Sequence, residues 1–152
     1  MIKYRRVTDL VPTISTLVVS QVQHNPSPAF ENFLKTNPVI IPIPLHGQRK
    51  RERWFNQSEL FARQLAKIWK RTVETGLLIR HKRTEPQAVL PKEARLKNVR
   101  GSFRIRTNGI SRIPDSVLIL DDVWTTGSTM REAGDVLKRA GVRKVWVFTI
   151  AR

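Results

Sequence analysis

The order of three segments in the C-terminal part of the chain constrains the fold most strongly. Val117 to Leu120 form a continuous apolar run, which predicts a strand. Lys144 to Ala151 form a second strand-like run. Between them, apolar residues at helical spacing predict a helix that stops at Gly141 and buries Met130, Ala133, Leu137 and Ala140. A strand, a helix and a strand in succession imply parallel pairing, so the sequence predicts an α/β fold.

The rest of the chain supplies further helices and strands. The expected helices cover residues 8–23, a short segment from Ser27 with Pro28 in its first position, and the residues after Asn56, where Phe61, Leu65 and Ile68 share one face. Asn56 and Glu59 have the spacing of a capping box. The expected strands lie within Pro38–Pro44, Thr75–Arg80 and the alternating stretch around Phe103 and Ile105.

Composition narrows the class of protein. The 152 residues suit a single domain, 1–152, with one core. Lysine and arginine number 28 against 12 acidic residues, and a net charge of +16 favours a polyanionic partner such as nucleic acid, a nucleotide or a diphosphate. The absence of cysteine excludes disulfides, thiolate zinc sites and a cysteine nucleophile, and the histidines lack metal-ligand spacing. The sequence has neither a membrane-spanning apolar run nor a recognisable signal peptide, so we expect a cytoplasmic protein.

Two adjacent carboxylates follow the first of the C-terminal strands in this otherwise basic chain. Ligands of an open parallel sheet bind beyond the carboxyl ends of its strands, where Asp121 and Asp122 stand. The turn into the next helix, Thr125, Thr126, Gly127, Ser128 and Thr129, offers hydroxyls and helix-start amides that suit a phosphate monoester. Ionised carboxylates only accept hydrogen bonds, so the acid pair suits two neighbouring sugar hydroxyls. The pattern therefore favours a bound ribose 5-phosphate.

Two other interpretations of this stretch stay open. A hydrophobic strand that ends in two aspartates also resembles the magnesium-binding strand of P-loop ATPases, although the G-x-x-x-x-G-K-[ST] motif that such proteins require is absent. The stretch also fits an ordinary strand followed by a capped helix, with both aspartates in solvent.

Three motifs together resemble a known family. VLILDDVWTTGST, Val117 to Thr129, resembles the phosphoribosyl pyrophosphate (PRPP) motif of type I phosphoribosyltransferases. IIPIPLHGQRKRERWFNQSELFARQLA, Ile40 to Ala66, resembles the signature of the competence-protein F (ComF/GntX) family within that fold, as do Arg83–Phe103 and the terminal VFTIAR. The resemblance covers nearly the whole chain. It implies a type I phosphoribosyltransferase-like fold, with a parallel sheet of about five strands flanked by helices.

The resemblance also implies a ligand and its site. PRPP, or a ribonucleotide, is expected with its ribose hydroxyls on Asp121 and Asp122, which are the expected catalytic residues, and its 5-phosphate on Thr125–Thr129. The diphosphate is expected near the loop after the strand in Pro38–Pro44. Mg²⁺ carried by that diphosphate is the implied cofactor, in keeping with its preference for few protein ligands. The arginines expected at the diphosphate are Arg49, Arg51, Arg53, Arg80 and Arg83.

The implied reaction displaces diphosphate from PRPP and transfers the phosphoribosyl group to an acceptor that the sequence does not identify. The family is linked to natural transformation, which keeps a second interpretation open. In it, the chain is a non-catalytic accessory protein of DNA uptake that binds PRPP or a nucleotide. Its partners would be single-stranded DNA or the competence machinery, and the basic charge suits such DNA.

Many ComF-like proteins begin with a four-cysteine zinc module, and this chain has no cysteine. Its first residues, MIKYRRVTDL, resemble the segment that follows the module. Loss of the module and an internal start of the sequence both stay open.

Overall fold

The computed structural model describes residues 2–46, 55–82, 98–106, 108 and 112–151. Its helices are α1 (Ile2–His24), α2 (Pro28–Leu34), α4 (Gln57–Trp69) and α6 (Ser128–Arg139). Its strands are β1 (Val39–Pro42), β2 (Leu78–Arg80), β3 (Phe103–Ile105), β4 (Ser116–Val123) and β5 (Lys144–Ala151). Within these ranges, none of the helices has the length and apolar character needed to cross a membrane.

The central sheet is parallel and has the strand order β1–β4–β5. Leu118 in the middle strand lies opposite Ile40 on β1 and Trp146 on β5. Val73 adds an isolated parallel bridge to Ile40. The prediction of an α/β fold built on a parallel sheet is thereby confirmed.

Among the described residues this sheet has three strands, whereas the sequence analysis expected about five. β2 and β3 pair with each other instead, antiparallel, with Arg80 opposite Phe103. Leu78 and Phe103 are buried in the same hydrophobic cluster as the apolar face of α6. Burial against α6 accounts for the separate two-stranded ribbon, because it holds these short strands away from the edges of the central sheet.

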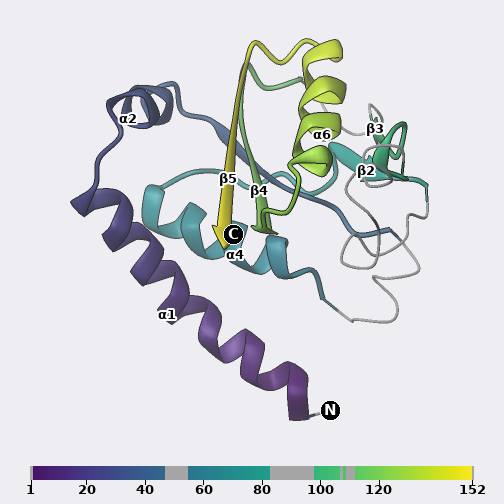
Figure 1. The fold of residues 1–152 in the computed structure, drawn as a ribbon. Coiled ribbons are helices and arrows are strands. Elements are labelled where there is room, and N and C mark those ends of the chain that lie inside the picture. Colours follow the sequence, from purple (N-terminus) through teal and green to yellow (C-terminus); the bar gives the residue numbers. More distant parts are fainter. Residues whose placement is uncertain (1, 47–54, 83–97, 107, 109–111, 152) are drawn as a thin grey trace.

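The side chains of β4 alternate between two hydrophobic clusters, because successive residues of a strand point to opposite faces. Val117 and Ile119 join the cluster that contains the apolar face of α6. Leu118 and Leu120 join the opposite cluster, to which α1, α2 and α4 contribute. Figure 1 shows α6 and the β2–β3 ribbon on one side of the strands and α1 and α2 on the other. Helices therefore cover both faces of the sheet.

The buried face of α4 differs in part from the predicted one. Phe61 and Leu65 are buried as expected, but Ile68 is 40% exposed. Ala62 and Ala66 occupy the buried positions instead. Small side chains let the helix backbone approach the sheet closely, and this orientation turns Ile68 toward solvent.

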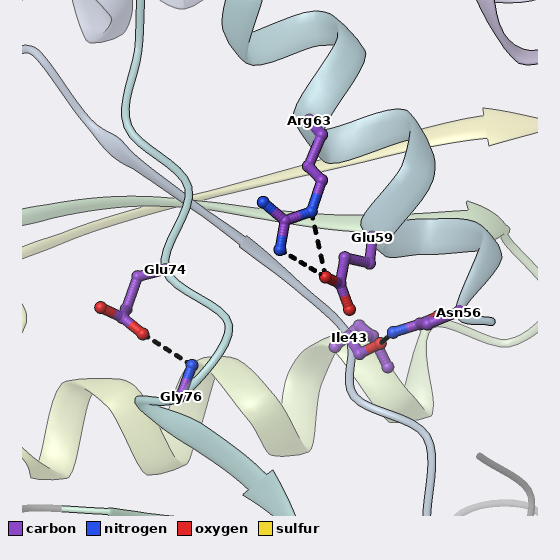
Figure 2. Close-up of polar contacts among 6 residues, drawn as sticks. All are labelled: Ile43, Asn56, Glu59, Arg63, Glu74 and Gly76. Carbon is purple, nitrogen blue, oxygen red and sulfur yellow. Dashed lines mark hydrogen bonds and ion pairs between the residues drawn. The ribbon is translucent and has the colours of Figure 1, made fainter. Parts of the chain in front are cut away.

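Two helix starts also differ from the predictions. α1 begins at Ile2 rather than at residue 8, since no proline or glycine interrupts the first turns. Asn56 precedes α4, but its side chain makes no capping bond; its Nδ2 donates to the carbonyl of Ile43, 2.9 Å away. Glu59 accepts two hydrogen bonds from Arg63 and does not turn back to the helix start (Figure 2). The predicted capping box is wrong, because the carbonyl at the end of β1 takes the asparagine amide.

Candidate functional site

A pocket opens at the carboxyl ends of β1 and β4, where the starts of α4 and α6 also lie. The residues that line it are Ile43, Leu45, Phe55, Asn56, Gln57, Ser58, Arg80, Asp121, Asp122, Val123, Trp124, Thr125, Gly127, Thr129 and Met130. These are the strand ends at which an open α/β sheet binds its ligands. Figure 1 shows the first turn of α4 close to the tip of β4.

Asp121 lies near the end of β4, and two donors hold its carboxylate. Ser58 Oγ donates to Oδ1 at 2.8 Å, and the backbone N–H of Asp122 donates to the same oxygen at 3.0 Å. Burial, followed by the negative charge of Asp122, raises the pKa of Asp121 to about 7, and the hydrogen bond from Ser58 opposes this rise. Asp121 therefore changes between a protonated and an ionised form near neutral pH.

The turn between β4 and α6 is tied to the sheet and ends in a glycine. The backbone N–H of Trp124 donates to the carbonyl of Ala151 on β5, 2.8 Å away. Gly127 has a φ of 72°, which only glycine adopts without strain, and is the N-cap of α6. Because glycine has no side chain to accept from the first amides, the helix start carries its N–H groups and positive dipole end without a side-chain cap.

The hydroxyl residues of this turn take two different positions. Thr125 and Thr129 line the pocket. The hydroxyls of Thr126 and Ser128 lie 3.0 Å apart and form a hydrogen bond with each other. The pocket therefore brings together Asp121, Asp122, Thr125, Gly127 and Thr129 from the predicted ribose 5-phosphate site.

Arg80 brings a positive charge to the pocket from the end of β2. Its guanidinium carbon lies 5.4 Å from the centre of the Phe103 ring, across the β2–β3 ribbon. Stacking on an aromatic ring holds a planar cation in place. The other arginines expected at a diphosphate lie outside the described residues; they are Arg49, Arg51, Arg53 and Arg83.

The contribution of α4 was missed in the sequence analysis. Asn56, Gln57 and Ser58 line the pocket at the start of this helix. The side chain of Asn56 reaches the end of β1 (Figure 2), and that of Ser58 reaches the end of β4. The available signal was a group of polar residues at a predicted helix start, which resembles the hydroxyl-rich start of α6.

Residues 56–152 match the phosphoribosyl transferase domain family. Competence protein F of Haemophilus influenzae is 32% identical over 119 residues, which cover 78% of this chain and 52% of that protein. DNA utilization protein YhgH of Escherichia coli O157:H7 is 29% identical over 151 residues, which cover 99% of this chain and 64% of that protein. The chain thus spans between half and two thirds of the length of these relatives.

A solved structure shares the fold. The allosteric regulatory enzyme of purine biosynthesis aligns with a TM-score of 0.52 and 19% identity, over 95% of this chain and 25% of that one. The family match covers the helix start at Asn56, the acid pair and the turn before α6. The chain therefore belongs to the phosphoribosyl transferase domain family, as a ComF-like member with the type I α/β fold.

Proposed function

We propose that the chain binds PRPP with Mg²⁺ and transfers the phosphoribosyl group to an acceptor, with release of diphosphate. The observation that carries this proposal is that one pocket contains both the Asp121–Asp122 pair and the uncapped start of α6. Carboxylates suit hydroxyl donors, and helix-start amides suit an anion. A phosphorylated sugar offers both kinds of group, and a ribonucleotide would be held in the same way.

The ribose 5-phosphate end of the ligand is matched by the tip of β4 and the turn that follows. In this proposal Asp121 and Asp122 accept hydrogen bonds from the ribose hydroxyls. The hydroxyls of Thr125 and Thr129 and the amides after Gly127 donate to the 5-phosphate. Thr126 and Ser128, whose hydroxyls bind each other, hold the shape of the turn.

The start of α4 and Arg80 line the same pocket and suit a second anionic group of the ligand. The positive end of a helix and a guanidinium both favour a diphosphate. Arg49, Arg51, Arg53 and Arg83 are assigned to this group by their sequence motif and remain part of the proposal.

Mg²⁺ fits this arrangement as a companion of the diphosphate. In the described ranges, no group of three or more histidines and carboxylates is placed to hold a metal ion. Mg²⁺ commonly binds through substrate phosphates and water with few protein ligands, so the diphosphate itself can carry it. When bound, it supplies positive charge next to the leaving group.

The reaction is a displacement at C1 of the ribose. A nucleophilic atom of the acceptor forms a bond to C1 while the C1–O bond breaks, and diphosphate leaves with the electron pair. Positive charge develops on the sugar ring in such glycosyl transfers. Asp121 and Asp122, when ionised, stabilise that charge through the ring hydroxyls, and Arg80 offsets the negative charge that gathers on the leaving group.

Ligand-induced stabilisation tests the binding step. PRPP with Mg²⁺ at about a hundred times its dissociation constant should add roughly 2.7 kcal/mol to the free energy of unfolding and raise Tm by several degrees. Asp121→Asn with Asp122→Asn should abolish this shift while the chain stays folded. The matched control is Asp9→Asn with Asp135→Asn, which makes the same charge change at exposed positions outside the pocket. A folded wild-type chain without any shift would contradict the proposal.

Release of diphosphate tests the transfer step. Purified chain is mixed with PRPP, Mg²⁺ and a panel of nucleobases and other nitrogen acceptors, and diphosphate is measured enzymatically. We expect release that depends on one acceptor class and disappears in the double asparagine variant. Binding of PRPP without release for any acceptor would favour the second candidate function.

The second candidate is a non-catalytic accessory role in DNA uptake. It is favoured by the names of the relatives, a competence protein and DNA utilization proteins, and by the net charge of +16. In this role the pocket binds PRPP or a nucleotide as a signal, and a basic surface binds single-stranded DNA or the competence machinery. Affinity for single-stranded DNA should fall steeply with salt, and persistence of that slope in the double asparagine variant would separate this surface from the pocket.

A further inference from the structure

The start of α4 is fastened to the tips of two neighbouring strands by two buried side chains. Ser58, which is 4% exposed, donates from Oγ to Asp121 Oδ1 on β4 at 2.8 Å. Asn56, which is 8% exposed, donates from Nδ2 to the carbonyl of Ile43 after β1 at 2.9 Å. Asn56 therefore holds the helix in place, and the Ser58 hydroxyl meets a residue of the proposed ribose site.

The bond from Ser58 constrains the orientation of the Asp121 carboxylate. The backbone N–H of Asp122 donates to the same oxygen, Oδ1, at 3.0 Å. Two donors on one oxygen fix the plane of the carboxylate. They leave Oδ2 as the oxygen for a hydroxyl of the ligand, since an ionised carboxylate accepts on both oxygens.

We propose that Ser58 is a positioning residue for phosphoribosyl binding, which fixes the orientation of the Asp121 carboxylate through the hydrogen bond from its hydroxyl to Oδ1. This inference rests on the function proposed above. The PRPP-like motif contains the acid pair and the turn after β4, whereas Ser58 lies outside that motif and reaches Asp121 from the start of α4.

The electrostatics of the site give this bond a measurable consequence. Burial and the charge of Asp122 raise the pKa of Asp121, and the Ser58 hydroxyl counteracts them because it stabilises the ionised form. Among the described residues, the other charged groups that line the pocket are Asp122 and Arg80. Loss of the hydroxyl should therefore raise the pKa of Asp121 further and reduce the ionised fraction at neutral pH.

The test measures PRPP affinity in the presence of Mg²⁺ by calorimetry between pH 6 and 9. For Ser58→Ala we expect a loss of roughly fivefold near pH 7 and almost no loss at pH 9, where Asp121 is mostly ionised in both proteins. The pH midpoint of binding should thus move upward by about one unit. Ser58→Thr, which restores a hydroxyl, should return the midpoint toward that of the wild type.

A matched control removes the same hydroxyl elsewhere. Ser15 is fully buried in α1 and does not line the pocket, so Ser15→Ala should leave PRPP affinity unchanged at every pH. If Ser58→Ala does not fold, Ser58→Cys keeps a side chain of similar size with a weaker donor and should show a smaller upward shift, read below about pH 8, where a thiol is mostly protonated. A folded Ser58→Ala or Ser58→Cys variant whose affinity curve is parallel to the wild-type curve at all pH values would overturn the positioning role alone. A wild-type chain that binds no PRPP would instead overturn the proposed function, and this role with it.

Discussion

A β-carbon added to Gly127 would lie 2.5 Å from Cζ2 of Trp124, which is closer than real β-carbons come to other heavy atoms. The same glycine has a φ of 72°, a conformation that other residues adopt only with strain. The indole of Trp124 packs in turn against the hydrophobic cluster under α6. The Trp124 ring and the absence of a side chain at Gly127 together determine the shape of this turn, which we propose binds the 5-phosphate.

Gly127→Ala is therefore expected to lower the free energy of unfolding by about 1–3 kcal/mol and to weaken PRPP binding. Both the backbone strain and the contact with Trp124 contribute. The double variant Trp124→Ala with Gly127→Ala removes the contact and keeps the strain, so it should recover part of the affinity. Urea denaturation and calorimetry measure the two effects.

Gly101 offers a matched control for this prediction. Its φ is 66°, but an added β-carbon would meet nothing within 4 Å. Gly101→Ala should carry the strain alone and leave PRPP affinity intact. Equal losses of stability in the two single variants would show that Trp124 makes no steric demand on Gly127.

The raised pKa of Asp121 makes the stability of the ligand-free chain depend on pH. This pKa is about 7 in the folded chain against an ordinary value of 3.8, so the folded state holds a proton that the unfolded state has released between these values. The stabilisation that the folded chain gains from protonated Asp121 is fully present below about pH 4. It is lost as the pH rises to about 7, and no further loss occurs above that pH.

Asp121→Asn removes this titration, so the variant should gain stability relative to the wild type by roughly 2–3 kcal/mol as the pH rises from about 5 to 7. Urea denaturation of both proteins at each pH gives the difference, in which the titrations of other groups cancel. A difference that does not change across this range would contradict the burial of a protonated Asp121.

Asn56 is expected to matter for stability because it satisfies a backbone carbonyl at the end of β1. Asn56→Ala leaves the Ile43 carbonyl without this donor, and we expect a loss of about 1–3 kcal/mol in the free energy of unfolding. Asn25→Ala is the control, since Asn25 makes an exposed hydrogen bond to Gln21 and should cost less than about 0.5 kcal/mol. Similar losses in the two variants would mean that the bond to Ile43 contributes little.

The sequence allowed the β4–α6–β5 unit to be predicted because its information is local. The apolar run from Val117 and the helical spacing after Thr129 each show their structure within a few residues. The acid pair and Gly127 follow directly on that strand, so their approximate positions could be predicted with it. The residues that form this part of the pocket are therefore close to one another in the sequence.

The contribution of α4 could not be predicted in this way. Ser58 and Asp121 are 63 positions apart, and no local pattern shows which side chain a buried hydroxyl will meet. Asn56 had two chemically reasonable partners, the helix amides and a strand-end carbonyl, and only the packing of α4 on β1 selects the second. The exposure of Ile68 could not be predicted for the same reason. Helical spacing shows which residues share a face, but not how the helix is rotated against the sheet.

Arg80 is expected to contact the diphosphate end of the proposed ligand, so its replacement should affect PRPP more than ribose 5-phosphate. It lines the pocket and is stacked on Phe103, whereas Arg104 next to it in the ribbon is exposed and lies outside the pocket. Arg80→Ala should weaken PRPP binding by roughly tenfold or more, as expected for the loss of one charge-assisted contact. Ribose 5-phosphate, which lacks the diphosphate, should lose less than about threefold.

Arg104→Ala makes the same change in charge one strand away and should leave both affinities nearly unchanged at about 0.15 M salt, where exposed charges are screened. Calorimetric titration of both ligands into the three proteins gives the comparison. Equal losses for PRPP and ribose 5-phosphate in Arg80→Ala would place the arginine at the 5-phosphate end. Equal losses in Arg80→Ala and Arg104→Ala would show that general surface charge, and not a contact at the diphosphate, attracts the ligand.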